Sequence, residues 1–442
     1  MQRPLIAVLI ASAFMTFNAQ AADLVQVYQQ ALANDATFAG ARASLTAGEE
    51  RITQGRAGLL PFISASGSNS RNTGDITTAN NYLGPGIPGS KRDNDYHANN
   101  YQVTLTQPLF NWASWQQYQQ SKLVQAAAEA SFAQAQQDLI VRVAQAYFDV
   151  LTAQDYLTAT RAQKVATTEQ LASAKRNFEV GTQTITDTHE AQAAYDLVVA
   201  QEFAAINDLD NKRTALQVII GQAPAELAPL RAGVTLAAPQ PATMDPWVSS
   251  AEGQNYAVVG AQLQLEIAKR DIERNRSGHY PTVNLVASNT HSNQTASTTA
   301  NGNSIGVQWN VPLFSGFAVT SKVRESIALE DKARNDLEAT RRVAAQGARQ
   351  AFLGVNSGLA QVKALEAAEV SSKSSLDSNK LGYQVGVRIN IDVLNAQKQL
   401  YATQQTLSKA RYDTIMAGLR LKAAAGSLKP EDLDTINALL AR

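Results

Sequence analysis

The sequence has no cysteine, no excess of charge of either sign and few histidines, and each shortage excludes a class of function. Without cysteine there are no disulfides, no thiolate metal sites and no lipid-anchored N-terminal cysteine. Lysine and arginine total 38, as do aspartate and glutamate, so the net charge is zero. Because no basic excess is present to neutralise phosphates, nucleic acid is not an expected partner.

Motifs of catalysis and cofactor binding are also missing. The chain has no Walker motif, no HExxH pair and no Gly-x-Ser-x-Gly elbow. Gly84-x-Gly86-x-x-Gly89 has the spacing of a dinucleotide fingerprint, but it carries two prolines, follows no apolar strand and opens no helix. The histidines lack the convergent spacing of a metal site; they are His97, His189, His279 and His291. We therefore expect no enzyme activity, no metal and no cofactor.

The first 21 residues match a secretory signal peptide. Arg3 supplies the positive charge, residues 5–17 are almost wholly apolar, and Ala19-Gln20-Ala21 fits the small-x-small pattern for cleavage after Ala21. The apolar run is too short to span a bilayer, and no later segment approaches the roughly 20 apolar residues of a transmembrane helix. Any membrane-spanning part of the mature chain would then have to be a β-barrel.

Landmarks in the first half of the chain recur in the same order in the second half. They are Ala39-Gly40-Ala41 with Val259-Gly260-Ala261, Pro61 with Pro281, Pro108-Leu109-Phe110 with Pro312-Leu313-Phe314, Phe178-Glu179-Val180-Gly181 with Tyr383-Gln384-Val385-Gly386, Asp187 with Asp392, and Gly221 with Gly426. The offset changes between Pro61 and Pro108, which places an insertion in the first half. We predict repeat 1 at residues 22–222 and repeat 2 at 247–442, with a proline-rich linker at 223–246.

Each repeat contains a predicted pair of strands, at about residues 60–110 and 281–314. Residues 101–106 alternate strictly between apolar and polar, which is typical of a strand with two differently solvated faces. In a membrane barrel the apolar set would face lipid and the polar set a wet lumen. The segments 67–99 and 288–303 are rich in Gly, Asn, Ser and Thr and are expected to be loops at the extracellular end. An ordinary soluble hairpin is the alternative.

Very long helices follow the strands. Residues 113–178 contain neither proline nor glycine, and at roughly 1.5 Å per residue they would reach about 100 Å. A second long helix is predicted at 318–381, with shorter helices at 38–59, 188–221 and 391–425 and a short C-terminal helix. Two offset apolar stripes on the first long helix allow packing on both sides, as the wall of a helical cylinder requires.

The order of these elements resembles the TolC family of outer-membrane efflux and secretion proteins across essentially the whole mature chain. The most specific segment is Leu381-Gly382-Tyr383-Gln384-Val385-Gly386-Val387-Arg388-Ile389-Asn390-Ile391-Asp392-Val393-Leu394-Asn395-Ala396, which is similar to the second periplasmic helical turn of that family. The resemblance implies a mainly α fold with long antiparallel coiled-coil helices that form a trimeric α-barrel. Four strands from each protomer would build a 12-stranded transmembrane β-barrel continuous with it.

The resemblance also implies a gate at the helical turns. Thr186 and Asp187 of repeat 1 would face Tyr383 and Arg388 of repeat 2, with Asp392 lining the constriction. Within a protomer Tyr383 is expected to pair with Asp187, while Arg388 reaches Thr186 or Asp187 of a neighbour. The chain departs from the family at Asn395, where a second acidic residue is usual. Alternatively, Asp187 and Asp392 are N-caps of the following helices, or serve both purposes.

These inferences predict a passive exit duct in the outer membrane of a tripartite export system. Its expected partners are two further copies of the chain, outer-membrane lipid, a periplasmic adaptor (a membrane fusion protein) and an inner-membrane ABC or proton-driven transporter. Type I protein secretion and multidrug efflux both stay open as its task. The alternative is a periplasmic coiled-coil scaffold, which leaves two alternating strand pairs unexplained.

Overall fold

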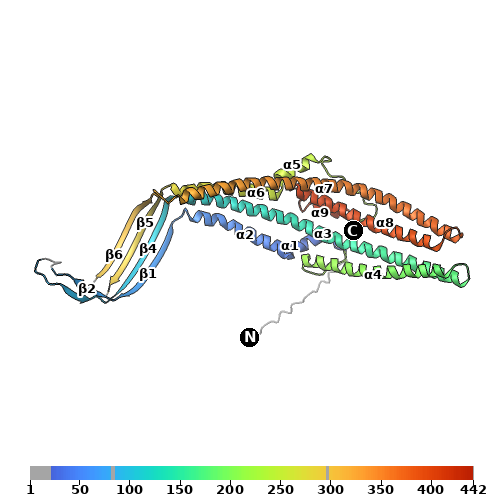
Figure 1. The fold of residues 1–442 in the computed structure, drawn as a ribbon, viewed down its shortest axis with the longest axis horizontal. Coiled ribbons are helices and arrows are strands. Elements are labelled where there is room, and N and C mark those ends of the chain that lie inside the picture. The colour runs from blue at the N-terminus through green and yellow to red at the C-terminus, as the bar shows by residue number, and fades with distance from the viewer. Residues whose placement is uncertain (1–20, 81–84, 295–297, 442) are drawn as a thin grey trace, which may run out of the picture. The chain divides into compact units, whose positions relative to one another are not determined.

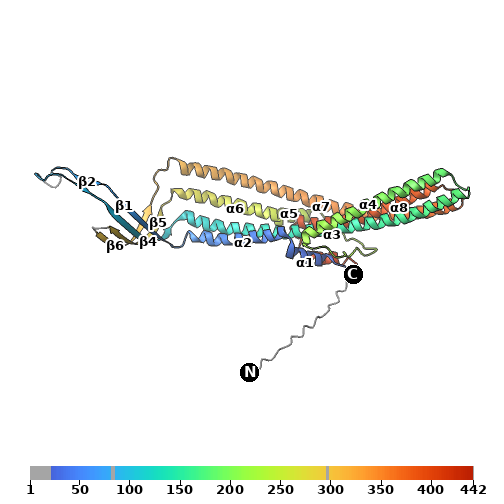
Figure 2. The ribbon, with the colours of Figure 1, turned by 90° about the horizontal axis from the view of Figure 1, so that it is seen from below.

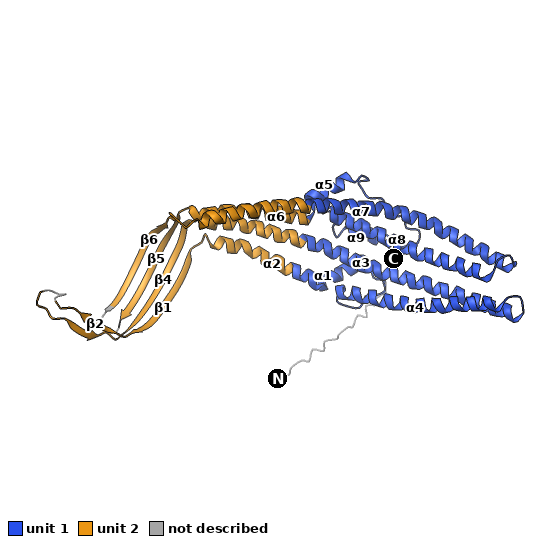
Figure 3. Ribbon diagram, in the orientation of Figure 1, with its two compact units in different colours: residues 1–41, 133–255, 341–442 blue, residues 42–132, 256–340 orange. Residues whose placement is uncertain are grey.

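A computed structural model describes residues 21–80, 85–294 and 298–441. The predicted signal peptide lies outside these residues except for Ala21. The chain divides into two compact units, coloured separately in Figure 3. Unit 1 comprises Met1–Ala41, Ala133–Asn255 and Arg341–Arg442, and unit 2 comprises Arg42–Phe132 and Tyr256–Thr340. Each unit therefore takes segments from both predicted repeats.

Unit 2 contains a four-stranded antiparallel sheet in the order β1-β4-β5-β6. The strands are β1 Phe62–Asn72, β4 Tyr96–Phe110, β5 Thr282–Gln294 and β6 Thr298–Asn310. The central pairing, β4 with β5, joins the first half of the chain to the second. The predicted contribution of four strands is confirmed.

The two segments expected to be loops are largely strand, so that prediction was wrong. β1 and β4 extend into 67–99, where β2 (Asp75–Thr78) and β3 (Ser90–Asp93) form a further hairpin. β5 and β6 fill most of 288–303, and their polar side chains pair across the strands. Ser288 Oγ lies 2.9 Å from Ser304 Oγ, for example. Hydrogen bonds of this kind between opposed polar side chains stabilise the pairing of the strands. The hydropathy of these segments alone predicts a loop instead.

The two faces of this sheet differ in polarity. Directly opposed residues share a face, so one row across the four strands is Ile63, Leu105, Ala287 and Ile305. The next row, on the other face, is Ser64, Thr104, Ser288 and Ser304. The side chains at the two edges of the apolar row are exposed, to 65% at Ile63 and 76% at Ile305, and the central Leu105 and Ala287 are half-buried. The sequence alternation thus places an apolar row on one face of the sheet and a row of hydroxyls on the other.

Helices α2 (Ala36–Ala57) and α6 (Tyr256–Arg276) pack in unit 2 against the first part of α3 (Trp112–Glu179). A Cβ at Gly55 would lie 2.4 Å from Ser121 Oγ, so glycine allows the close approach of α2 and α3. On the α6 side, Gln120 Nε2 donates to the Asp271 carboxylate at 2.9 Å. The 3-10 turn η1 (Ser277–His279) connects α6 to β5.

Two antiparallel helical hairpins dominate unit 1 (Figures 1 and 2). The first joins α3 to α4 (Ile185–Ile220), and the second joins α7 (Ala318–Gln384) to α8 (Asn390–Ala424). In both views the two turns lie at the same end of the unit. Small apolar clusters bind the helices together, one of them made by Leu171 and Ala174 of α3, Ala191 of α4 and Leu394 of α8.

The N-terminal segment, the inter-repeat linker and the C-terminus meet around Tyr147 of α3. The Tyr147 hydroxyl shares its one hydrogen between the backbone oxygen of Ala228, at 2.8 Å, and that of Ala22, at 3.2 Å. Three short helices accompany these segments: α1 (Leu24–Asn34), α5 (Asp245–Gln254) and α9 (Asp432–Asn437). The buried Asp35 carboxylate, between α1 and α2, accepts two hydrogen bonds of 3.0 Å from the Arg142 guanidinium.

In the part of the chain that the structure describes, every helix is too short or too polar to cross a membrane. The mainly α fold class, with its long antiparallel helices and four-stranded sheet, is confirmed.

Candidate functional site

The two hairpin turns of unit 1 form the candidate site, and we call them the tip. They comprise residues 180–184, between α3 and α4, and residues 385–389, between α7 and α8. Gly181 and Gly386 occupy equivalent places, and each has a φ of 79°. In each turn the amide of the residue after the glycine donates to a backbone oxygen of the preceding long helix. These hydrogen bonds are Thr182 N to Asn177 O and Val387 N to Gly382 O, both at 2.9 Å. Glycine supplies the left-handed residue that ends each long helix.

Asp187 is occupied in capping α4. Its Oδ2 accepts from the Thr184 amide at 3.1 Å and from the Thr184 hydroxyl at 2.8 Å, while its own amide donates to Thr184 Oγ1 at 3.4 Å. This is a reciprocal capping box in which Thr184 is the N-cap and Asp187 is the third residue of the helix, so the expectation that Asp187 itself is the N-cap was wrong, although its carboxylate takes part in the cap. Thr186, also predicted at the gate, is exposed one residue earlier.

Asp392 occupies the equivalent place on α8 with a weaker cap. Its Oδ2 accepts from the Ile389 amide at 3.4 Å, and Ile389 has no hydroxyl to complete a box. The same oxygen lies 3.7 Å from Arg388 NH1. Arg388 therefore pairs within its own turn and packs its stem over Gly382. Asn395, three residues after Asp392, is exposed.

Tyr383 links the two hairpins, but through other partners than the sequence suggested. Its hydroxyl donates to Gln183 Oε1 at 3.1 Å and accepts from Asn177 Nδ2 at 3.2 Å. The expected bond to Asp187 of the same protomer is not among the contacts of the described residues. Two hydrogen bonds from Thr184 hold Oδ2 of Asp187 at the start of α4, while the Tyr383 hydroxyl already has partners in Gln183 and Asn177.

Asn390, which sequence reasoning overlooked, makes a second link between the hairpins. The side chain is fully buried, donates to the Asp187 backbone oxygen at 3.1 Å and accepts from Gln170 Nε2 at 2.5 Å. Its counterpart in repeat 1, at the offset of the Asp187 and Asp392 pair, is Ile185, which is 46% exposed. The sequence signal that could have identified Asn390 is this difference between the repeats, an amide in one and isoleucine in the other.

A charged cluster joins α3 to α4 farther from the tip. Glu202 accepts from Lys164 Nζ at 2.7 Å and from Arg161 Nε at 3.1 Å. The hydrogen bonds from Lys164 and then Arg161 lower the pKa of the Glu202 carboxyl. Glu202 offsets one of the two positive charges, and the three groups cross-link the first hairpin, as a structural ion pair does.

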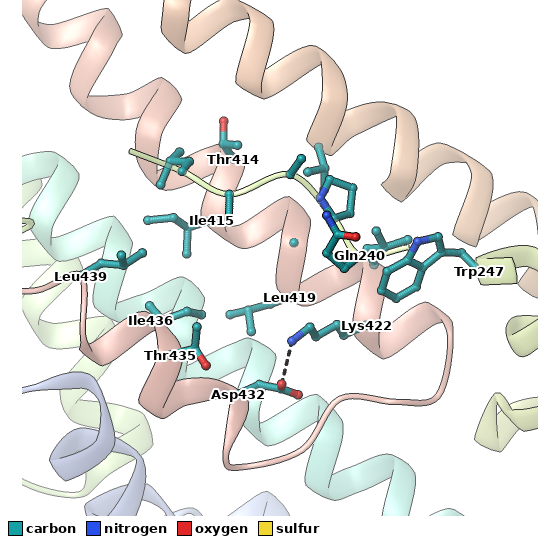
Figure 4. A pocket seen from close by; sticks show the side chains of 17 residues that line it. Gln240, Trp247, Thr414, Ile415, Leu419, Lys422, Asp432, Thr435, Ile436 and Leu439 are labelled. Carbon is teal, nitrogen blue, oxygen red and sulfur yellow. Dashed lines mark hydrogen bonds and ion pairs between the residues drawn. The ribbon is translucent and has the colours of Figure 1, made fainter. Parts of the chain in front are cut away.

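An apolar pocket of about 320 Å³ lies in unit 1 between the linker, α8 and α9 (Figure 4). Ile415 and Leu419 of α8 and Trp247 of α5 line it, and an ion pair of 2.7 Å between Lys422 and Asp432 lies among its lining residues. Trp247 Nε1 is satisfied by the Pro241 oxygen at 2.9 Å. Across the described residues no group of three or more His, Cys, Asp or Glu could hold a metal ion.

Comparison with known proteins agrees with this architecture. A family model described as outer membrane efflux protein matches residues 27–222 and 247–427. The chain is 33% identical to the outer membrane protein TolC of Vibrio cholerae serotype O1, over 95% of this chain and 94% of the relative. It is 32% identical to the alkaline protease secretion protein AprF of Pseudomonas aeruginosa, over 95% and 88%. A crystal structure of a membrane protein from Pseudomonas aeruginosa superposes with a TM-score of 0.80 at 20% identity, covering 93% of this chain and 91% of that chain.

Proposed function

The chain belongs to the outer membrane efflux protein family, and we infer that it is an outer-membrane channel that serves as the exit duct of an export system. The family model matches most of both halves of the chain. The family is described as outer membrane efflux protein. A passive duct, without a catalytic centre of its own, is the function that the fold supports best.

The observation that carries this proposal is the polarity of the sheet in unit 2. One face presents Ile63 and Ile305 at opposite edges of an apolar row, and the other presents a row of hydroxyls. Such a sheet suits a lipid-facing outside and a water-filled inside. A periplasmic coiled-coil scaffold would have no use for an exposed apolar face, so we disfavour that alternative.

We propose that three copies close this sheet into one barrel. Within the described sheet, β1 and β6 each pair on one side only, which leaves two open edges. An open edge is not viable in lipid, because its backbone groups would lack hydrogen-bond partners. Pairing β1 of one copy with β6 of the next satisfies both edges, and three-fold symmetry then gives the 12-stranded barrel.

Exposed apolar side chains on the hairpins of unit 1 also support association. Val165, Phe203 and Val218 on the α3/α4 hairpin are 61%, 70% and 78% exposed, and Val343 and Val370 on α7 are each 67% exposed. Contact with neighbouring helices would remove these side chains from water. We propose that they meet neighbouring protomers in a homotrimer, whose helices from repeats 22–222 and 247–442 form the wall of a periplasmic tunnel.

The tip is the proposed gate and the proposed docking place for partners. Its turns expose Val180, Val385 and Val387, at 68%, 65% and 75%. We propose that a periplasmic adaptor covers these side chains and couples the duct to an inner-membrane transporter. The relative AprF bears the name of a protease secretion protein, and we propose the same class of task, protein secretion, alongside small-molecule efflux.

The residues proposed to shape the gate are Thr186, Asp187, Tyr383, Arg388, Asp392 and Asn395. Tyr383 supports this assignment most directly, because it bonds across the two hairpins. Arg388 and Asp392 form a pair with partly exposed side chains, which water and salt weaken easily. That property suits a contact that has to be released when an adaptor binds.

Purified protein reconstituted into planar lipid bilayers tests the proposal. We expect discrete conductance steps and, after detergent extraction of the outer membrane, a trimer by mass. A protein that stays in the periplasmic fraction and gives no conductance would refute the channel and favour the scaffold.

A further inference from the structure

Asn390 is a buried amide at the start of α8 whose two hydrogen bonds reach two other helices. Its Nδ2 donates to the Asp187 backbone oxygen on α4 at 3.1 Å. Its Oδ1 accepts from Nε2 of Gln170 on α3 at 2.5 Å. One side chain therefore joins the α7/α8 hairpin to both helices of the α3/α4 hairpin.

The surroundings of this amide exclude water. Asn390 is 0% exposed and Gln170 is 9% exposed. The adjacent apolar cluster contains Leu171 and Ala191 of the first hairpin and Leu394 of the second. A buried amide that loses its partner stays unpaired, and the penalty corresponds to a change of about 5- to 150-fold in an equilibrium constant.

The other polar contacts of the tip resist separation less. Arg388 pairs with Asp392 within its own hairpin, so separating the hairpins of one protomer leaves that pair intact. Tyr383 does cross between the hairpins, but its side chain is only half-buried, and water can take the place of Gln183 and Asn177. Water cannot replace the partners of Asn390 in the same way, because this side chain is fully buried.

We propose that Asn390 is the positioning residue that holds the two hairpins of a protomer together at the tip, so that opening has to break both of its hydrogen bonds. We call this pair of hydrogen bonds the latch. The proposal rests on the proposed function, because holding the hairpins together matters only where the tip gates a channel. Ile185 holds the equivalent place in repeat 1 and is exposed, so each protomer contains one such amide. A trimer would contain three copies that act together.

The test uses the purified full-length protein and three variants, Asn390→Leu, Gln170→Leu and the double variant. Hydrogen–deuterium exchange is measured on peptides of the tip, and single-channel conductance is measured in planar bilayers. The matched control is Thr403→Val, also on α8. Thr403 is 6% exposed, and among the described residues its hydroxyl bonds only to Gln399 of the same helix, at 2.8 Å and 3.3 Å.

We expect amide exchange at the tip to rise about 5- to 150-fold in each single variant. The double variant should exchange about as fast as the singles, because the first substitution already breaks the link between the hairpins. Exchanging the two amides, in Gln170→Asn with Asn390→Gln, should restore most of the protection. The Thr403→Val control should leave exchange at the tip unchanged.

Equal exchange at the tip in Asn390→Leu and Thr403→Val would overturn the latch, and so would additive effects in the double variant. If Asn390→Leu fails to assemble, the same comparison is made with Gln170→Leu, which leaves α8 intact. The two measurements distinguish failure of the proposed channel function from failure of the latch. Unchanged exchange with conductance raised by Tyr383→Phe refutes only the latch, whereas faster exchange in a protein that never conducts refutes only the channel.

Discussion

Arginine placed at Ile305 should prevent assembly in the membrane, whereas arginine at the adjacent Ser304 should be tolerated. Ile305 belongs to the apolar row that crosses all four strands, and Ser304 belongs to the hydroxyl row on the other face. If the apolar face meets lipid, the guanidinium of Ile305→Arg lies in hydrocarbon. The guanidinium of Ser304→Arg would lie in the wet lumen.

The register of the sheet sets the expected magnitude. On the apolar face, Trp309 pairs with Val283 near one end, and Tyr101 pairs with His291 toward the other. The row of Tyr101 corresponds to Asn301 on β6, eight residues from Trp309, or about 27 Å along the strand. With a tilt of about 40° this span covers about 20 Å of membrane depth, close to the roughly 25 Å apolar band of such barrels.

Ile305 lies midway between these aromatic rows. Arginine at mid-depth costs about 2–4 kcal/mol for each copy, and therefore about 6–12 kcal/mol for three copies. Arginine at Val307, one row nearer the end, should cost less, and Gln308→Arg should match the tolerated Ser304→Arg.

The assay measures the yield of trimer extracted from outer membranes and its urea midpoint in liposomes. Because the chain has no cysteine, single cysteines at positions 304 and 305 can also be labelled without background. A lipid-phase probe should label only Ile305→Cys, and a membrane-impermeant probe added to open channels should label only Ser304→Cys. Equal labelling of both, or equal loss of trimer in both arginine variants, would refute the assignment of the faces.

Three further predictions concern unit 1. Tyr383→Phe should raise single-channel conductance more than Arg388→Ser, because Tyr383 bonds across the two hairpins of a protomer whereas Arg388 pairs within its own hairpin; an equal or smaller effect in planar bilayers would contradict this. Asp392→Ala should weaken cation preference and block by multivalent cations, measured from zero-current potentials, and an unchanged potential would remove Asp392 from the lumen. Burial alone would raise the pKa of Asp35, but hydrogen bonds from Arg142 and the backbone outweigh it and lower that pKa. Its stabilising contribution is therefore complete above the ordinary aspartate pKa and is lost as pH falls through the lowered value. Asp35→Asn should cost roughly 1–3 kcal/mol at neutral pH and flatten the acid dependence of thermal melting, and a variant that keeps the parent profile would argue against the pair.

Local periodicity was sufficient for the main elements. The sequence predicts a helix at 113–178, and α3 runs from Trp112 to Glu179. It predicts another at 318–381, and α7 runs from Ala318 to Gln384. Proline and glycine act on the backbone of their own neighbourhood, so their absence from a long stretch is informative without knowledge of packing. The apolar and polar faces of the strands follow equally directly from alternation at period two.

Polar strands were harder to recognise. The segments 67–99 and 288–303 have loop composition, yet β5 and β6 continue through most of the second segment. Their stability in the ladder comes from partners such as Asn289 and Asn303, which bond across strands at 2.6 Å. Composition reports each side chain alone, whereas a polar strand depends on what lies opposite.

By itself, therefore, the sequence determined the helices, the two-faced strands and the family, because these depend on the order and spacing of residues along the chain. Only the tertiary structure decided which groups meet at the tip. Asp187 caps its own helix, Tyr383 bonds to Asn177 and Gln183 instead, and Asn390 is buried between hairpins. The contacts of Tyr383 and Asn390 join residues about two hundred positions apart, and their geometry depends on how two hairpins pack, which no local pattern encodes.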